Sequence, residues 1–235
     1  MSPKKSKSAI EMAAARLRAV ILKKENGALL GSEDELQRIL EVSRPTMRQA
    51  ARMVEREGLL VVKRGNNGGY FGARPDPAFI EATVSTYLEV LDADPKDLTL
   101  IASVLWVEVV RRAAALKNAA SAQVTSGFRK KVSKLTDDTG FSELLELDQQ
   151  IRSAVFDLIK SPYVELIFNI NGNFARRYLT DSPSARNDTP EHTKFVDAWR
   201  KAKLLELDAI ANGDEEIATL AAQRARNLVH ERVWL

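Results

Sequence analysis

The stretch Glu41-Val-Ser-Arg-Pro-Thr-Met-Arg-Gln-Ala-Ala-Arg-Met-Val-Glu55 decides the fold of the N-terminal part of this 235-residue chain. Its apolar residues recur at the spacing of one helical face, which predicts a helix. Ser43 lies where a capping residue is expected, and Pro45 is tolerated because it falls in the first turn. The residues that we expect to face inward are Met47, Ala50, Ala51 and Val54.

Two further helices are predicted before this stretch and a hairpin after it. The first helix covers about residues 8–24, and Ser32 with Glu35 three residues later forms a capping box that starts the second. Residues 59–63 are apolar and β-branched, residues 64–69 form a glycine-rich turn, and the chain then returns as a second strand. Three short helices and a basic two-stranded wing predict a winged helix-turn-helix, which places one helix in the major groove of DNA.

The remainder of the chain has helical spacing throughout, starting at Pro77. Helix-breaking residues divide it, and we expect an all-helical bundle of six or seven helices. The fold class is therefore mainly α, with a DNA-binding domain at residues 1–75 and an effector-binding and dimerisation domain at residues 76–235. The expected breaks are at 94–95, 137–140, 161–162, 182–190 and 212–213.

The charge of the chain is unevenly distributed. Residues 1–75 hold 15 Lys and Arg against 8 Asp and Glu, a net charge of +7, whereas residues 76–235 hold 20 against 24, a net charge of −4. Basic charge is thus concentrated in the part expected to meet phosphates. The sequence contains no cysteine, which excludes disulfides, thiolate nucleophiles and cysteine zinc sites. It shows no glycine-rich phosphate loop, and its longest apolar run, 101–110, is too short to span a bilayer, so we expect neither an enzyme nor a membrane protein.

The expected DNA-contacting residues lie on the third helix and the wing. Arg44 and Arg48 are four residues apart and share a face, and an arginine fork suits guanine edges and phosphates. The alternative is that both arginines pair with Glu41 or Glu55 on an ordinary exposed helix. The full set of expected DNA-binding residues is Ser43, Arg44, Thr46, Arg48, Lys63, Arg64 and Gly65.

These segments resemble the GntR family of bacterial transcription regulators. The family pattern contains L-P-S-E-R-E-L and then V-S-R-x-T-V-R, and this chain has Leu30-Gly-Ser-Glu-Asp-Glu-Leu36 and Val42-Ser-Arg-Pro-Thr-Met-Arg48. The resemblance implies that Ser43, Arg44, Thr46 and Arg48 contact DNA and that Gly65 lies at the tip of the wing. One position departs from the family. Asp34 stands where the family has an arginine, and its carboxylate cannot donate to phosphate or guanine.

The helical remainder is similar to the effector domain of the FadR subfamily. Many members of that subfamily hold a metal on one aspartate and three histidines. The resemblance aligns Asp148 with the aspartate, but it places Arg152, Lys203 and Ala225 at the histidine positions. We therefore expect no metal and no other cofactor. The alternative is a metal-dependent regulator that senses a small carboxylate, with His192 or His230 recruited to the site.

The nearest branch of the subfamily responds to fatty acyl thioesters. Val104 lies where the metal-binding branch carries an arginine, so the resemblance favours a fatty acyl thioester or another largely apolar metabolite as effector. Ordinary core packing is the alternative for each aromatic side chain. The expected effector-binding residues are Val104, Trp106, Asp148, Arg152, Phe174, Arg177, Tyr178 and Trp199.

The sequence thus predicts a cytoplasmic, ligand-responsive transcription repressor. Its expected partners are a double-stranded DNA operator, a small-molecule effector and a second copy of the chain. An effector-independent architectural DNA-binding protein, in which the bundle serves assembly alone, is the alternative.

Overall fold

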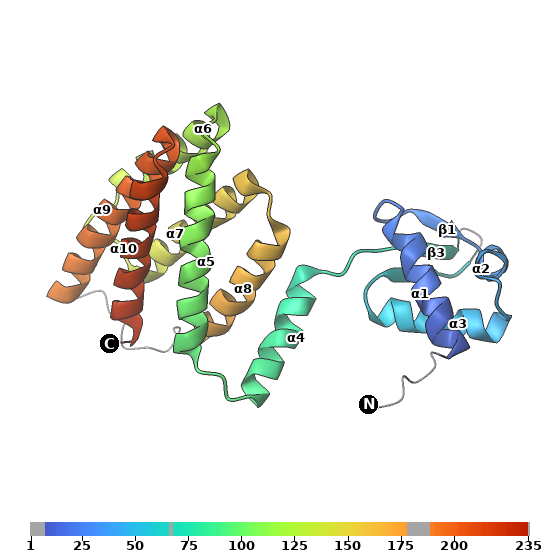
Figure 1. Cartoon of the computed structure of the whole chain (residues 1–235). Coiled ribbons are helices and arrows are strands. Elements are labelled where there is room, and N and C mark those ends of the chain that lie inside the picture. The colour runs from blue at the N-terminus through green and yellow to red at the C-terminus, as the bar shows by residue number, and fades with distance from the viewer. Residues whose placement is uncertain (1–7, 66–67, 178–188, 235) are drawn as a thin grey trace, which may run out of the picture. The chain divides into compact units, whose positions relative to one another are not determined.

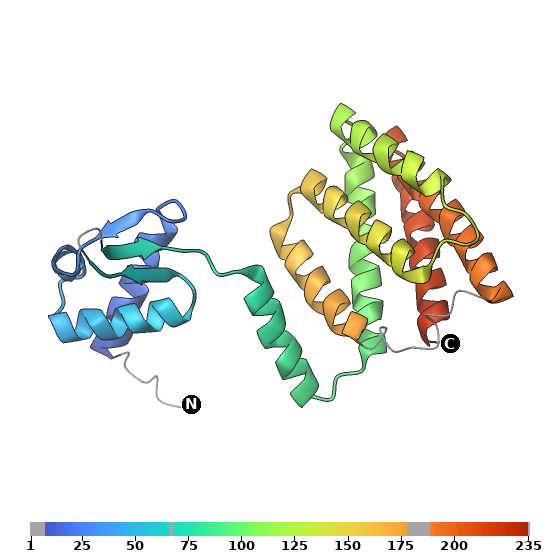
Figure 2. The same ribbon diagram turned by 180° about the vertical axis from the view of Figure 1, so that it is seen from behind.

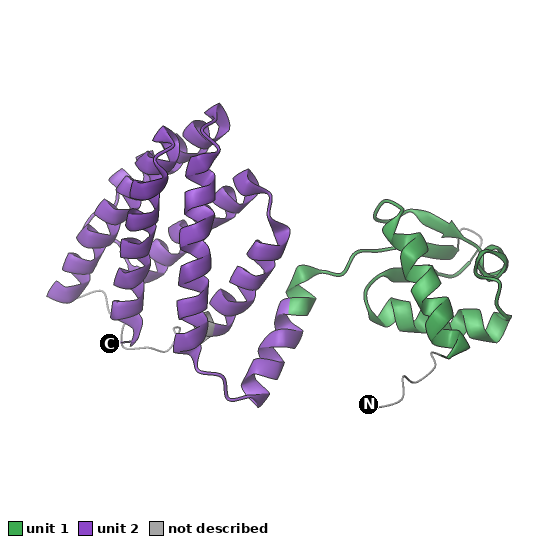
Figure 3. Ribbon diagram, in the orientation of Figure 1, with its two compact units in different colours: residues 1–80 green, residues 81–235 purple. Residues whose placement is uncertain are grey.

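The computed structural model describes residues 8–65, 68–177 and 189–234. The chain divides into two compact units, Met1–Ile80 and Glu81–Leu235 (Figure 3). Each unit has its own hydrophobic core. The division falls inside helix α4 (Pro77–Val90), which begins at the expected proline.

Unit 1 contains the three helices and the hairpin expected from the sequence (Figure 1). Helices α1 and α2 both pack against α3, which in turn contacts the hairpin. The buried core lies between them and includes all four residues expected to face inward from α3. The elements are α1 (Ala9–Leu22), β1 (Leu29–Gly31), α2 (Glu33–Leu40), α3 (Arg44–Arg56), β2 (Leu60–Lys63) and β3 (Gly69–Gly72).

The capping box predicted for α2 is confirmed. The Ser32 hydroxyl accepts a hydrogen bond from the Glu35 backbone N–H, and the Glu35 carboxylate accepts one from the Ser32 N–H at 2.6 Å. These two bonds satisfy donors that the helix would leave unpaired at its start. The helix ends at Glu41, whose left-handed backbone makes the turn toward α3.

The sheet has one strand more than predicted. The hairpin of β2 and β3 is present, but β1 pairs antiparallel with β3, giving the strand order β1-β3-β2. Leu29 lies opposite Phe71 in this register. The prediction missed β1 because a three-residue strand is too short to show an alternating pattern. The extra strand joins the segment before α2 directly to the wing.

The tip of the wing depends on glycine. Gly65 has a φ of +102°, a conformation that side chains with a Cβ rarely adopt. At Gly68 a Cβ atom would lie 2.5 Å from the backbone oxygen of Lys63 and 2.8 Å from that of Gly65. Neither position can therefore accept another residue without a change in the hairpin.

The described residues from 77 onward form seven helices and no strand, in agreement with the expected bundle. Every expected break within the described residues is present. One break was not predicted: Lys117 has a φ of +46°, and the Asn118 side chain caps the next helix. After α4, the helices are α5 (Pro95–Ala115), α6 (Ala119–Ser133), α7 (Phe141–Ile159), α8 (Pro162–Arg177), α9 (Pro190–Asn212) and α10 (Glu215–Trp234).

Helix α5 is the centre of unit 2. It contacts α7, α8, α9 and α10, while α6 lies across α9 on the side seen in Figure 2. Trp106 of α5 packs against Phe156 and Phe168, with ring centroids 6.0 and 5.9 Å away. This aromatic cluster joins α5 to α7 and α8, and its two phenylalanines line the cavity described below.

Several apolar side chains of α5 are exposed. Ile101 and Val104 are 49% and 62% exposed, whereas Ala102 and Trp106 lie in the core. Because α5 is apolar on both faces, hydrophobic spacing alone cannot select the inward one. The described residues therefore leave an apolar strip on α5 uncovered.

Candidate DNA interface and ligand cavity

The two expected recognition arginines lie on the surface of α3. The side chains of Arg44 and Arg48 are 55% and 58% exposed. Arg44 is the first residue of the helix, and Arg48 follows one turn later on the same face. In helix-turn-helix proteins the N-terminal residues of this helix meet the base edges.

Both arginines form ion pairs with the start of α2. Arg44 Nη2 lies 2.5 Å from Asp34 Oδ1, and Arg48 Nε lies 2.9 Å from Glu33 Oε1. Arg44 Nε is also 3.4 Å from Glu33 Oε1. The sequence alternative named Glu41 and Glu55 as partners, but the ion pairs within the described residues join the arginines to Glu33 and Asp34 instead. These acidic residues hold both guanidinium groups beside the N-terminus of α3.

Ser43 and Thr46 are linked to each other. Their hydroxyl oxygens are 2.8 Å apart, and the Ser43 side chain makes no hydrogen bond to the helix backbone. Ser43 occupies the capping position as expected but does not cap through its side chain. Ser43 is exposed and Thr46 is half-buried at the surface of the helix.

The wing carries two exposed basic side chains. Lys63 lies over the Phe71 ring, with its ammonium nitrogen 4.6 Å from the centroid, and Arg64 is exposed at the end of β2. Gly65 follows at the turn. The Phe71 ring thus contacts the ammonium group of Lys63, and the Lys63 residue remains exposed on the wing.

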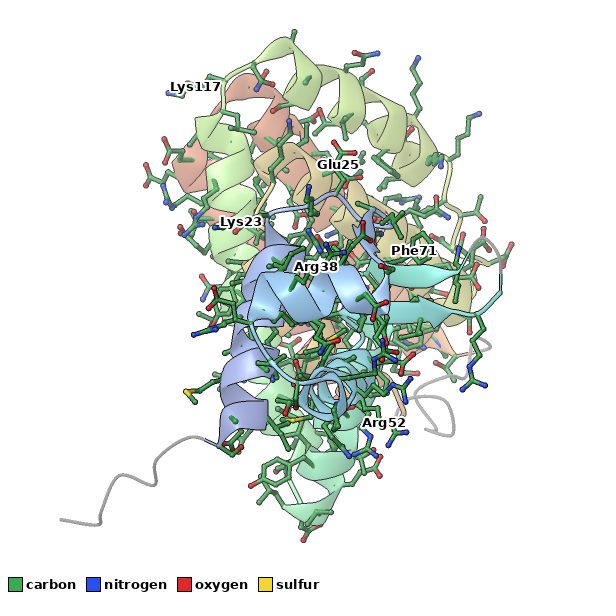
Figure 4. All side chains as sticks on the ribbon, turned by 90° about the vertical axis from the view of Figure 1, so that its right-hand side faces the viewer. Lys23, Glu25, Arg38, Arg52, Phe71 and Lys117 are labelled. Atoms are coloured by element: carbon green, nitrogen blue, oxygen red, sulfur yellow. The ribbon has the colours of Figure 1, made fainter. Side chains whose placement is uncertain are left out.

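A shallow groove on unit 1 brings α3 and the wing together. Arg48, Lys63, Arg64 and Gly65 all line it, and so does Arg52. Figure 4 labels Arg52 on this unit, and its side chain is exposed. The sequence analysis did not select Arg52, although it lies four residues after Arg48 and therefore on the same helical face. The groove is thus lined by basic residues from both expected DNA-contacting elements.

Unit 2 contains a cavity of about 160 Å³ between α5, α7, α8 and α10. Its lining is mixed, with Phe156 and Phe168 on one side and several charged or amide side chains elsewhere. Two expected effector residues, Asp148 and Arg152, line it. The other polar residues around the cavity include Gln149, Ser153, Glu165, Asn169, Asn173 and Arg226.

A buried charge cluster lies beside this cavity. Asp148 pairs with Arg152 one turn later on α7, and its Oδ1 lies 3.0 Å from Lys203 Nζ of α9. Lys203 Nζ also contacts Glu206 Oε1 at 2.9 Å and lies over the Trp106 and Trp199 rings. Burial lowers the pKa of Lys203, and the neighbouring Glu206 opposes that shift.

Arg226 of α10 adds a positive charge near Glu206, whose carboxylate partly opposes the effect of burial on the pKa of Arg226. Its Nε donates to the Ser103 hydroxyl at 3.2 Å, and it forms no ion pair with any described residue. Burial lowers the pKa of Arg226 to about 10. Across the cavity, burial raises the pKa of Glu165, with a further contribution from Asp157 and Glu81. An anion in the cavity would balance the charge of Arg226, a residue that the sequence analysis did not select.

The remaining expected effector residues do not line the cavity. Trp106, Phe174 and Trp199 are buried in the core, and Val104 is exposed. Arg177 ends α8 and Tyr178 follows it, and the Arg177 side chain and the whole of Tyr178 lie outside what the structure describes. The cavity is therefore more polar than the aromatic lining expected from the sequence.

His192, one of the two histidines considered for a metal site, has a packing role in the described part of the chain. His192 is fully buried, and its Nε2 lies 2.9 Å from the Thr139 backbone oxygen. No group of three potential metal-ligating side chains occurs among the described residues. Nor is any helix in the ranges described long and apolar enough to cross a membrane.

Residues 9–68 match the family of bacterial regulatory proteins named gntR. Among solved structures, the chain resembles a Streptococcus agalactiae GntR protein with a TM-score of 0.68 and 19% sequence identity, over 94% of this chain and 99% of that one. A GntR-family transcriptional regulator from Pseudomonas syringae pv. tomato aligns with a TM-score of 0.35 and 18% identity, over 96% of this chain and 87% of that one. No curated protein sequence matches the chain significantly. The N-terminal unit is therefore a gntR-family DNA-binding domain, and the fold of the chain agrees with that of a GntR regulator.

Proposed function

We propose that this gntR-type DNA-binding transcriptional regulator acts in the cytoplasm as a ligand-responsive, homodimeric repressor and has no catalytic role. The proposal that the protein binds DNA rests on the groove of unit 1. This groove is lined by Arg48 and Arg52 of α3 and by Lys63 and Arg64 of the wing. Arginine and lysine in this arrangement suit base edges and backbone phosphates of one duplex.

Selection of binding sites from a random-sequence duplex library by the full chain tests this part. We expect a two-fold symmetric motif, with half-sites about one helical turn apart. Fluorescence anisotropy on the selected duplex should then show tighter binding than on a scrambled duplex of the same composition. Equal affinity for both duplexes, with no motif selected, would overturn sequence-specific DNA reading.

A homodimer follows from the small size of a single reading surface. One winged helix contacts few base pairs, and two-fold symmetry doubles those contacts. The uncovered apolar strip on α5 supports a second copy as its partner, since Leu100, Ile101 and Val104 are 57%, 49% and 62% exposed. We expect sedimentation to show a dimer at micromolar concentration, and Val104→Glu to shift it toward monomer. A monomeric wild-type protein, with and without DNA, would contradict this arrangement.

The cavity of unit 2 supports a small polar effector in preference to a long acyl thioester. A cavity of about 150 Å³ holds a molecule the size of benzene, and this one measures about 160 Å³. Arg226 and Arg152 at its wall suit a small anion. The regulator would have two conformations, and in one of them the α3 helices of the dimer are wrongly spaced for the operator. A ligand that binds this conformation more tightly than the other would weaken operator binding, by an amount set by the ratio of its two affinities.

Mass spectrometry of small molecules carried by the purified protein, under native and denaturing conditions, tests the ligand response. We expect a small anion that is released on unfolding, is absent from an Arg226→Gln variant, and changes operator affinity when added back. Arg224→Gln is the matched control, because Arg224 is exposed on the same helix. If no molecule is carried, and a panel of small carboxylates and phosphates changes neither melting temperature nor DNA affinity, the effector-independent architectural protein becomes the better description.

A further inference from the structure

The contact between Asp34 and Arg44 lies at the N-terminus of α3, the end of the recognition helix that meets base edges in helix-turn-helix proteins. Arg44 is the first residue of α3, and Asp34 is the second residue of α2. Their side chains are 66% and 55% exposed, so the pair lies on the surface rather than in the core. A shallow hollow on unit 1 is lined by both residues, together with Gln37, Arg38 and Ser43. The pair is therefore accessible to whatever α3 binds.

Stability gives little reason for a carboxylate at this position. An exposed ion pair contributes little to folding. The favourable interaction of acidic residues with the N-terminus of α2 is already supplied by Glu33 and Glu35, and Glu35 also completes the capping box. Beside DNA, however, an unpaired carboxylate is repelled by phosphate. The position of Asp34 thus requires an explanation at the DNA surface.

The paired groups retain free hydrogen-bonding atoms of both kinds. Asp34 Oδ1 binds Arg44 Nη2, while Asp34 Oδ2 and Arg44 Nη1 have no partner among the described residues. The pair therefore presents an acceptor beside a donor. In the major groove an arginine donor suits the N7 and O6 atoms of guanine, and a carboxylate can accept only from an exocyclic amino group.

Cytosine is the base that this carboxylate fits. Cytosine offers its N4 amino group with no acceptor next to it on the major-groove edge. Adenine offers an amino group beside its N7 acceptor, and that lone pair would repel the second oxygen of Asp34. Thymine and guanine offer only acceptors on this edge, which a carboxylate cannot bind.

We infer that Asp34 is a specificity-determining residue that selects cytosine at one position of each operator half-site, with Arg44 reading a neighbouring guanine. This inference rests on the proposed function, because it requires α3 to enter the major groove. Arg44 fixes the Asp34 carboxylate in place and offsets its repulsion by phosphate. The pair then favours one base pair over others at the cost of general affinity for the backbone.

Binding-site selection by the full chain, repeated with Asp34→Ala and Asp34→Asn, tests the inference. We expect the wild-type motif to contain a cytosine in each half-site that Asp34→Ala no longer selects, while the remaining positions persist. The discrimination at that position, measured by anisotropy with all four bases, should fall about tenfold. Asp34→Asn should select adenine there instead, because an amide both donates and accepts and matches the N7 and N6 atoms of adenine.

Glu25→Ala is the matched control, since it removes the same charge from an exposed turn after α1. It should leave every position of the motif unchanged. Circular dichroism melting curves should be similar for all variants, because the residues replaced are exposed. A wild-type motif that both Asp34 variants reproduce at every position would overturn this inference and leave the proposed function standing. A wild-type protein that selects no motif would overturn both.

Discussion

Lys203 Nζ lies 3.0 Å from Asp148 Oδ1, and the two side chains are 1% and 6% exposed. Asp148 is the residue that the resemblance to the FadR subfamily aligns with a metal ligand. In this chain the Asp148 carboxylate forms one ion pair with Lys203 of α9. It forms a second with Arg152, which lies on α7 as Asp148 does. A buried carboxylate needs a positive partner, and here two side chains of the protein provide it.

Replacing Lys203 with Met should destabilise unit 2 by about 3–5 kcal/mol, because Glu206 would then be buried beside an apolar chain. Urea unfolding followed by tryptophan fluorescence measures this, since all three tryptophans lie in unit 2. The double variant Lys203→Met with Glu206→Leu should recover much of the stability, because Asp148 keeps Arg152. A single variant as stable as the wild type would show that the cluster is not essential for folding.

Glu108 should make the stability of unit 2 depend on pH. Hydrogen bonds from Arg111 and Arg112 lower the pKa of Glu108 from 4.5 to about 2. Because the folded-state pKa is depressed, the stabilisation is complete above about pH 4.5 and is lost as the pH falls toward 2. Glu108→Gln should therefore lower the melting temperature at pH 7 and make little difference near pH 2. Glu146→Gln, an exposed change on α7, should show no such convergence with the wild type.

Replacing Arg44 or Arg48 with Ala should weaken binding to the selected operator by roughly 1–3 kcal/mol for each arginine that reads a base. The melting temperature should change little, since exposed ion pairs contribute little to folding. Arg56→Ala removes the same charge from the far end of α3 and should have a much smaller effect. Anisotropy titrations at fixed salt provide the comparison, and unchanged affinity in both the Arg44 and the Arg48 variant would exclude this helix as the reader.

Lys63→Ala should weaken binding to all duplexes alike. Lys63 lies on the wing with its charge exposed, where a phosphate is the expected partner. Each phosphate contact contributes about 0.9 to the slope of log affinity against log salt, so the slope should become shallower by about that amount. A salt titration with operator and scrambled duplexes measures it. Weaker binding to the operator alone would instead assign Lys63 to a base.

Asp34→Arg should increase the affinity for random-sequence duplex at low salt. The change removes a carboxylate near phosphate, releases Arg44 and adds a donor where the gntR pattern has one. The salt dependence should become steeper, because more counterions are displaced. Unaltered binding across the salt titration would mean that residue 34 does not face DNA.

The N-terminal fold was predictable because its signals are local. Ser32 and Glu35 define the start of α2 within four residues, and the spacing from Met47 to Val54 defines the buried face of α3. The strand β1 was missed because its pairing with β3 is a contact between distant segments. The break at Lys117 was missed because the signal lies in a single asparagine, Asn118, whose side chain caps α6.

The cavity was less predictable for a different reason. Asp148 and Arg152 were selected through the family resemblance, whereas the aromatic residues were selected by type alone. Trp106 and Trp199 pack in the core because a large apolar side chain is stabilised by any buried position. Arg226 gave no signal, since a lone arginine on a helix normally lies in solvent. Only the packing of α10 against α5 places it at the cavity wall.

The crowding around Gly68 limits how this reading surface can be diversified by mutation. A combinatorial library that varies Arg64 would retain the hairpin, because that side chain projects freely from its end. Any residue other than glycine at position 68 would place a Cβ atom against two backbone oxygens. Library members with such a residue would lose the hairpin and could not be selected for DNA binding. New operator preferences are therefore more accessible through the exposed positions of α2 and α3 than through the tip of the wing.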